Sequence, residues 1–190
     1  GIHFIAGDAA VKIDRPRKQV HTKKGIVVDY DRLILATGSK PFIPPIKGSD
    51  LKGVLSFRDI YDVNTMLEYC KNKKNAVVIG GGLLGLEAAY GLKQRGMNVT
   101  VLHLMDRIMD RQLDARASAL LKQSIEAKGI PVLTEANTEE LIGQDGHVSQ
   151  LRLKDGTVLE ADFVIFAVGI RPNMALAQSA GLRCNRGVMV

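Results

Sequence analysis

The sequence contains no tryptophan and only 5% aromatic residues, so it is short of the ring surfaces on which nucleic acid bases stack. Its net charge of +6 is spread along the chain and forms no basic run. No stretch reaches the roughly eighteen apolar residues that a membrane span requires, and residues 1–11 lack a signal-peptide pattern. We therefore expect no nucleic-acid partner, no membrane segment and a cytoplasmic location.

Cysteine is also scarce. Cys70 and Cys184 belong to no closely spaced pair, which argues against a metal knuckle or a local redox disulfide. Cys70 falls on an expected helix, where we expect a partly buried, unreactive thiol. The four histidines show neither metal-ligand nor catalytic-triad spacing. The sequence thus predicts no metal site and no side chain acting as a catalytic nucleophile.

The first forty residues are rich in β-branched side chains and predict short strands at 18–22, 25–28 and 32–36. Residues 33–36 form a continuous apolar run, which favours a strand buried on both faces. Three prolines between positions 41 and 45 then exclude both a helix and a central strand, and indicate a crossing between domains. A helix is expected over 59–73.

From Ala76 onward, apolar strand patterns alternate with helical ones, which predicts a parallel sheet with right-handed crossovers. The expected strands are 76–79, 99–103, 131–134 and 163–168, and the expected helices are 83–95 and 113–128. In the second helix the expected core positions include Leu120. Three alternating segments at 139–142, 147–153 and 157–160, separated by Asp-Gly turns, predict an antiparallel three-stranded meander. Residues 188–190 resemble one further strand.

A glycine-rich turn between the first strand and helix of this second unit carries the chemistry. Gly80 permits a tight turn, Gly82 lets the backbone approach a ligand, and Gly85 lets helix and strand pack closely. The helix start then offers free N–H groups and the positive end of its dipole to phosphates. The strand–turn–helix–strand context predicts a site for the pyrophosphate of a dinucleotide.

Two further positions have alternative interpretations. The strand after the glycine turn should end in an acid that binds the adenosine ribose, but the sequence has His103 there. His103 with Arg107 could favour a 2′-phosphate, or His103 could be a half-exposed strand-end histidine, so NADH and NADPH both stay open. Glu87 is explained either by the helix dipole, as an acid in the first turn, or by a role beside the nicotinamide.

Three motifs, at residues 30–39, 80–87 and 167–173, resemble the pyridine nucleotide-disulfide oxidoreductase superfamily, whose members are flavoproteins that bind two dinucleotides. Within it, residues 103–105, 111–114 and 182–187 resemble the large subunits of NAD(P)H-dependent nitrite reductases. Rubredoxin and ferredoxin reductases are similar enough to be alternatives.

The resemblance implies two groups of cofactor-binding residues. Those expected to border FAD are Ala10, Thr37, Gly38, Ser39 and Arg58, with Ala10 near the adenine and Arg58 on the flavin side. Those expected to bind NAD(P)H are Gly80, Gly81, Gly82, Leu83, Leu84, Gly85, Glu87, His103, Arg107, Val168 and Gly169, with Val168 and Gly169 beside the bound nicotinamide.

The resemblance also implies a domain plan. Residues 1–55 and 172–190 would belong to an incomplete FAD-binding domain, into which a Rossmann-like NAD(P)H-binding domain at 56–171 is inserted. The family's FAD-pyrophosphate fingerprint would precede Gly1 and its Gly-Asp motif would follow Val190, so we expect a piece of a longer protein. The iron–sulfur and sirohaem groups of nitrite reductases would lie in the absent parts. A homodimer is a further expectation.

The implied function is hydride transfer from NAD(P)H to FAD, followed by electron transfer to a metal-centre acceptor in another domain or protein, for nitrite reduction. A rubredoxin or ferredoxin reductase would share the first step. A non-catalytic, redox-sensing dinucleotide module would need a DNA-reading helix or a basic stripe, and a small-substrate dehydrogenase would need a catalytic His or Lys. We expect residues 1–190 alone to bind NAD(P)H weakly, to hold FAD poorly and to be inactive.

Overall fold

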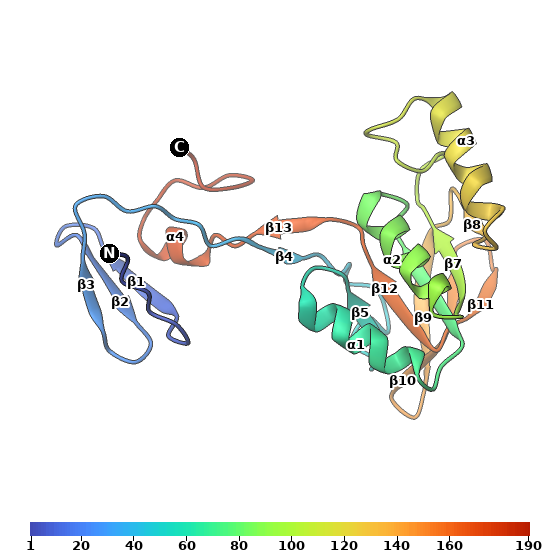
Figure 1. Ribbon diagram of the computed structural model, residues 1–190, viewed down its shortest axis with the longest axis horizontal. Coiled ribbons are helices and arrows are strands. Elements are labelled where there is room, and N and C mark those ends of the chain that lie inside the picture. Colours follow the sequence, from blue (N-terminus) through green and yellow to red (C-terminus); the bar gives the residue numbers. More distant parts are fainter. The chain divides into compact units, whose positions relative to one another are not determined.

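The computed structural model describes residues 1–190, which divide into two compact units. The larger unit comprises Pro41–Gly169, and the smaller unit comprises Gly1–Lys40 with Ile170–Val190. Each is described by itself below (Figure 1). No helix in the structure has the length and apolar character needed to cross a membrane.

A five-stranded parallel sheet forms the centre of the larger unit. Its strands lie in the order β5 (Val54–Ser56), β12 (Phe163–Phe166), β6 (Asn75–Ile79), β7 (Asn98–Leu102) and β8 (Val132–Leu133). Every neighbouring pair is parallel. The α/β fold expected from the alternating pattern is therefore confirmed, with the three-residue strand β5 as an addition that the sequence did not reveal.

The three longer helices pack on one face of this sheet. They are α1 (Ile60–Cys70), α2 (Leu83–Gln94) and α3 (Ala115–Glu126). Buried side chains of α1 and α2 meet alternate residues of the strands in a single cluster, as Met66 and Ala89 do with Val78. Aspartates cap the N-termini of two of the helices. The Asp59 side chain accepts hydrogen bonds from the first N–H groups of α1, and the Asp114 side chain accepts one from the N–H of Ala117 in α3.

An antiparallel meander covers the opposite face. It consists of β9 (Thr138–Gln144), β10 (His147–Leu153) and β11 (Val158–Glu160), in the order β11-β10-β9. Leu141 and Leu151 of the meander pack with Val77 and Val164, which point away from the helices. The parallel strands are thus buried on both faces, which explains their nearly continuous apolar sequence.

The compact unit begins at Pro41, earlier than the boundary at residue 56 that the sequence suggested. Residues 47–53 run along the meander, since the N–H of Leu141 donates to the carbonyl of Lys47 and the N–H of Val148 to that of Lys52. Gly48, at φ +82°, lies so close to Leu141 that a Cβ would overlap the Leu141 carbonyl. These contacts join the proline-rich stretch to the larger unit.

One expected core position of α3 is wrong. Leu120 is 60% exposed, whereas Ser118 is buried. The Ser118 hydroxyl donates to the carbonyl oxygen of Ile108 at 2.8 Å, so a polar side chain is satisfied inside the core. The spacing of apolar residues could not predict that a hydrogen-bonded serine, Ser118, would occupy a core position of this helix.

The smaller unit contains an antiparallel sheet of β1 (Ala10–Asp14), β2 (Gln19–Thr22) and β3 (Val27–Asp29), with the short helix α4 (Ala175–Ser179). Strand β4 (Ser39–Pro41) pairs with β13 (Ile170–Pro172). The buried strand expected at 33–36 is wrong, because no strand pairs with this segment and Ile34 is 89% exposed. The strand expected at 188–190 is reduced to a single bridge between Val188 and Cys184.

Candidate dinucleotide-binding site

The carboxyl ends of four neighbouring parallel strands carry most of the residues expected to bind NAD(P)H, together with Arg58, which was expected on the flavin side. Arg58 follows β5, Val168 and Gly169 follow β12, the turn at 80–82 follows β6, and His103 follows β7. Open α/β sheets bind ligands in the crevice outside this edge. Residues from positions 58, 80, 103 and 168 therefore converge on one edge although they are far apart in sequence.

Three of the four glycines in the turn are required by packing. A Cβ at Gly80, whose φ is +125°, would overlap the carbonyl oxygen of Ala167, and a Cβ at Gly85 would overlap that of Gly80. At Gly81 a Cβ would lie 2.7 Å from Cγ2 of Ile108. These positions bring strand, helix and the following loop into close contact, so their glycines have a structural reason that is independent of any ligand.

Gly82 is different, because nothing within the protein lies within 4 Å of the position of its Cβ. Its φ of −87° and ψ of −176° suit any residue, and it begins α2 without a side-chain cap. The first N–H groups of a helix have no intrahelical acceptor, and the dipole places partial positive charge there. The open space beside Gly82 and these donors fit a pyrophosphate.

The start of α2 also exposes two apolar side chains and one acid. Leu83 and Leu84 are 58% and 40% exposed, and Glu87 is exposed as well. The helix begins at Leu83, so Glu87 lies in its second turn, and the first turn holds no acid. The expectation that Glu87 belongs to the first turn is thus wrong, and the helix dipole explains this carboxylate less well than the sequence suggested.

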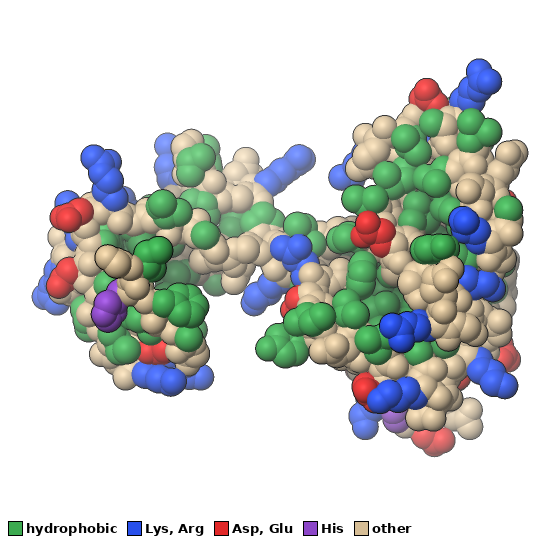
Figure 2. Space-filling view, in the orientation of Figure 1, with side chains coloured by type: hydrophobic (Ala, Val, Ile, Leu, Met, Phe, Trp, Pro, Cys, Tyr) green, Lys and Arg blue, Asp and Glu red, His purple; other side chains and the backbone are tan.

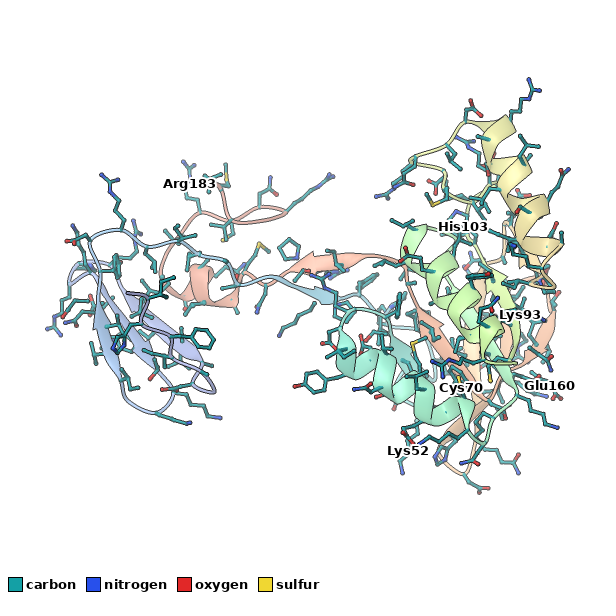
Figure 3. The ribbon with its side chains drawn as sticks, in the orientation of Figure 1. Lys52, Cys70, Lys93, His103, Glu160 and Arg183 are labelled. Carbon is teal, nitrogen blue, oxygen red and sulfur yellow. The ribbon has the colours of Figure 1, made fainter.

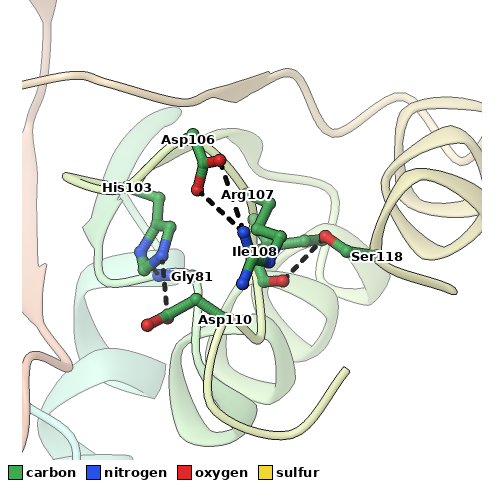
Figure 4. Close-up of polar contacts among 7 residues, drawn as sticks. All are labelled: Gly81, His103, Asp106, Arg107, Ile108, Asp110 and Ser118. Carbon is green, nitrogen blue, oxygen red and sulfur yellow. Dashed lines mark hydrogen bonds and ion pairs between the residues drawn. The ribbon is translucent and has the colours of Figure 1, made fainter. Parts of the chain in front are cut away.

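His103 is fixed rather than loosely placed at the end of β7 (Figure 3). The N–H of Gly81 donates to Nδ1 of His103 at 3.0 Å, and Nε2 lies 3.2 Å from Oδ1 of Asp110. Only 12% of the imidazole is exposed, which is less than the half-exposed histidine considered from the sequence. The ring therefore links the glycine turn to a carboxylate that sequence reasoning did not single out (Figure 4).

Arg107 lies in the same loop, but its guanidinium faces an acid. Its Nη1 is 3.4 Å from both carboxylate oxygens of Asp106, and this pair is well exposed. Arg107 and His103 do not contact each other: Arg107 pairs with Asp106 and His103 with Asp110, so the two residues expected to act together on a 2′-phosphate have separate partners. Arg58 lies in the turn from β5 to α1, where its N–H donates to Oδ2 of Asp62 at 2.7 Å.

The remaining expected residues belong to the smaller unit. Ala10 is exposed at the start of β1. Thr37 and Gly38 lie on the segment before β4, where the Thr37 hydroxyl donates to the carbonyl of Asn173 at 2.7 Å and the N–H of Asn173 donates to the carbonyl of Gly38 at 2.9 Å. Ser39 begins β4. These bonds hold the small-residue segment against the chain that returns after residue 170.

A parallel sheet with an open glycine turn at its carboxyl edge, helices on one face and a meander on the other is the architecture of a dinucleotide-binding domain. The family model described as pyridine nucleotide-disulphide oxidoreductase matches residues 1–190, so the chain belongs to this family. The family resemblance inferred from the three sequence motifs is confirmed.

Two proteins of Bacillus subtilis are among the relatives of this chain. Its nitrite reductase (NAD(P)H) is 52% identical over 189 residues, covering 100% of this chain and 23% of the relative. Its assimilatory nitrate reductase electron transfer subunit is 43% identical over 190 residues, covering 100% of this chain and 24% of the relative. The chain therefore spans about a quarter of the length of these curated relatives.

Among solved structures, a ferredoxin reductase from Rhodopseudomonas palustris superposes with a TM-score of 0.92 at 30% identity. The superposition covers 96% of this chain and 45% of that protein. This similarity supports the fold described above.

Proposed function

We propose that this chain is the pyridine-nucleotide-binding part of a flavoprotein that passes hydride from NAD(P)H to FAD and electrons onward to a metal-centre acceptor. The observation that carries the proposal is the space beside Gly82, at the uncapped start of α2 and the carboxyl edge of the sheet. Backbone N–H groups at this place suit the two linked phosphates of a dinucleotide.

Residues of the larger unit are assigned to three parts of the bound nucleotide. The turn Gly80–Gly85, including Gly81, Leu83 and Leu84, would hold the pyrophosphate. His103 and the loop that contains Arg107 would lie beside the adenosine. The nicotinamide would lie near Glu87, Val168 and Gly169. Val168 is 39% exposed and Gly169, at φ +117°, has an open Cβ direction, so both leave room for a ring. The protein's task is to align this ring and exclude water.

FAD would be held by the smaller unit, Gly1–Lys40 with Ile170–Val190, with Ala10, Thr37, Gly38 and Ser39 along it and Arg58 on the flavin side. Support comes from the family membership and from the small, exposed residues at 37 and 38, which let a ligand approach the backbone. When bound, the flavin supplies a site that accepts hydride and releases electrons singly. The larger unit, Pro41–Gly169, would form the NAD(P)H-binding domain, in place of the bounds 56–171 expected from the resemblance.

For the whole protein we propose nitrite reduction in the cytoplasm. The 52% identity to a nitrite reductase supports this substrate, and iron–sulfur and sirohaem groups outside residues 1–190 would receive the electrons. Ferredoxin or rubredoxin reduction is the second candidate, which the TM-score of 0.92 to a ferredoxin reductase favours. A homodimer stays a prediction that sedimentation of the full-length protein tests.

The test uses the full-length holoprotein under anaerobic conditions. We expect a coloured protein whose flavin absorbance is bleached by NADH or NADPH and restored by nitrite. Restoration by oxidised ferredoxin or rubredoxin, but not by nitrite, would favour the second candidate. A colourless protein that reduces no added flavin would contradict both.

Alanine variants of Gly82 and Gly91 test the pyrophosphate site, with Gly91 as the matched control. Gly82→Ala places a methyl group where the phosphates would bind, so nucleotide affinity and flavin reduction should fall together while the fold is kept. Gly91→Ala changes the same residue type on the same helix, also in open space, and should leave nucleotide affinity unchanged. Equal affinities in the two variants would contradict the assigned pyrophosphate site.

A further inference from the structure

The chain lacks the usual source of a ribose-binding carboxylate. In dinucleotide-binding domains the strand after the glycine turn ends with an acid that accepts hydrogen bonds from the adenosine ribose. Here β7 ends at Leu102 and is followed by His103. A neutral imidazole at this position would neither repel a 2′-phosphate strongly nor accept two ribose hydroxyls. The choice between NADH and NADPH must then come from another group.

Hydrogen bonding fixes the tautomer of His103. Because the N–H of Gly81 points at Nδ1 from 3.0 Å, Nδ1 must be the acceptor and the proton of the neutral ring belongs on Nε2. Nε2 then donates to Oδ1 of Asp110, 3.2 Å away. One edge of the ring is therefore anchored to the glycine turn, and its other edge holds a carboxylate beside that turn (Figure 4).

The backbone brings Asp110 to this place. The N–H of Met109 donates to the carbonyl of Gly81 at 2.9 Å, with Met109 in the left-handed region at φ +51°. Ile108 is fully buried, and Ser118 of α3 donates to its carbonyl oxygen. The loop after β7 thus folds back onto the glycine turn. This brings the Asp110 side chain, which is 25% exposed, into contact with His103.

The partners of the charged side chains in this loop support Asp110 as the ribose-binding acid. Arg107 is the cation that could accept a 2′-phosphate, but it pairs with Asp106 at the surface. The Asp110 carboxylate, by contrast, contacts His103 and forms no ion pair with a lysine or arginine. A 2′-phosphate carries a charge of about −1.5 to −2 at neutral pH and would be repelled, whereas a ribose 2′-hydroxyl could donate to the carboxylate.

We propose that Asp110 supplies the carboxylate that binds the adenosine ribose, that His103 is its positioning residue, and that the site consequently selects NADH over NADPH. The inference rests on the proposed function, because it presumes a dinucleotide at the glycine turn. It names the nucleotide that the sequence left open.

The first experiment measures dissociation constants of NADH and NADPH for the full-length flavoprotein, together with the rate of flavin reduction by each. The wild type should bind NADH more tightly, and 5′-AMP should compete better than adenosine 2′,5′-bisphosphate. Asp110→Asn should reduce the NADH preference on the order of tenfold. Asp106→Asn removes an exposed carboxylate from the same loop and should change this preference much less.

Variants of His103 separate its two hydrogen bonds. His103→Asn keeps an acceptor near Nδ1 for the Gly81 N–H but removes the donor to Asp110, so the NADH preference should fall as in Asp110→Asn. His103→Gln places an amide donor near Nε2 and should restore part of the preference. A purely structural role of His103 would lower stability without changing the ratio of the two dissociation constants.

The outcomes distinguish this inference from the function on which it rests. If neither nucleotide binds or reduces the flavin, the proposed function fails. If both do and Asp110→Asn leaves their ratio unchanged, or if the wild type prefers NADPH and Arg107→Gln abolishes that preference, only the assignment to Asp110 is overturned. The competition by 5′-AMP and the bisphosphate uses the wild type, so it decides the preference even if a variant fails to fold.

Discussion

The Cα of Gly85 in the first turn of α2 faces the carbonyl oxygen of Gly80 at the end of β6 so closely that a Cβ at position 85 would overlap this oxygen. The same Cβ would also lie 3.4 Å from that of Ala167, beyond the end of β12. The two glycines therefore set how close the helix lies to the central strands, and with it the position of the helix start at which phosphates would bind.

Gly85→Ala should destabilise the larger unit by roughly 1–3 kcal/mol, because the backbone of the turn must shift to remove the overlap. Urea unfolding measures this loss. Gly91→Ala, in open space on the same helix, should instead be neutral or stabilising by up to about 1 kcal/mol, since alanine has the higher helix propensity. Equal stabilities of the two variants would show that the close approach is not required.

Ser118→Ala tests how the loop after β7 is held. The substitution removes the donor to the Ile108 carbonyl inside the core and should cost about 1–2 kcal/mol, because it leaves that oxygen without this partner. Ser124→Ala, at an exposed position of α3, is the matched control and should leave the unfolding midpoint nearly unchanged. If Asp110 depends on this loop, Ser118→Ala should also weaken the NADH preference.

Much of the larger unit follows from local patterns. The strand 75–79, the glycine turn and the helix 83–94 were predictable because apolar runs, backbone freedom and helix spacing are properties of neighbouring residues. The meander was predictable for the same reason, since Asp-Gly turns separate segments of alternating polarity.

The features that were missed depend on contacts between distant residues. Strand β5 has only three residues and exists because β12, more than a hundred positions later, pairs with it. Residues 33–36 have the composition of a buried strand but no pairing partner in this chain, and composition cannot show that. Asp110 reaches His103 only because Met109 bonds to Gly81, a fold-back that no spacing rule reveals. Local sequence thus located the turn but not the acid beside it.

Glu140 is the buried acid of the meander, and it should contribute to the attachment of residues 47–53. Its side chain is 8% exposed and contacts Lys47 at 2.6 Å and also Arg152. Glu140→Gln should cost about 1–2 kcal/mol; the loss stays moderate because Lys47 and Arg152 are exposed enough to be hydrated afterwards.

Glu139→Gln is the control for this substitution. Glu139 contacts Arg152 at 3.3 Å from an exposed position, so its removal should have little effect on the urea midpoint. Limited proteolysis gives a second measurement, because Glu140→Gln should increase cleavage within residues 42–53 and Glu139→Gln should not. A Glu140 variant as stable as the Glu139 variant would mean that the two parallel bridges hold this segment without the ion pairs.

Cys70, near the end of α1, should react slowly with alkylating agents at neutral pH (Figure 3). Burial raises the pKa of its thiol above the ordinary value of 9.0, and the nearby Arg95 only partly opposes this effect. The thiolate is the nucleophile, so at any pH below its pKa less of it is present than in a free thiol. In a Cys184→Ser background, the alkylation rate should therefore rise with pH along a curve whose midpoint lies above 9.0.

Arg95→Gln tests how much the positive charge of Arg95 lowers the pKa of Cys70. Removing the positive charge should raise the pKa of Cys70 further and slow alkylation at pH 8, because the attraction that stabilises the thiolate is lost. Lys71 is the next position along the chain but pairs with Glu68, so Lys71→Gln in the same background should change the rate less. A midpoint below 9.0, or a faster reaction in Arg95→Gln, would show that desolvation does not control this thiol. Figure 2 shows Lys and Arg side chains dispersed over the visible face of the protein and not gathered in one stripe.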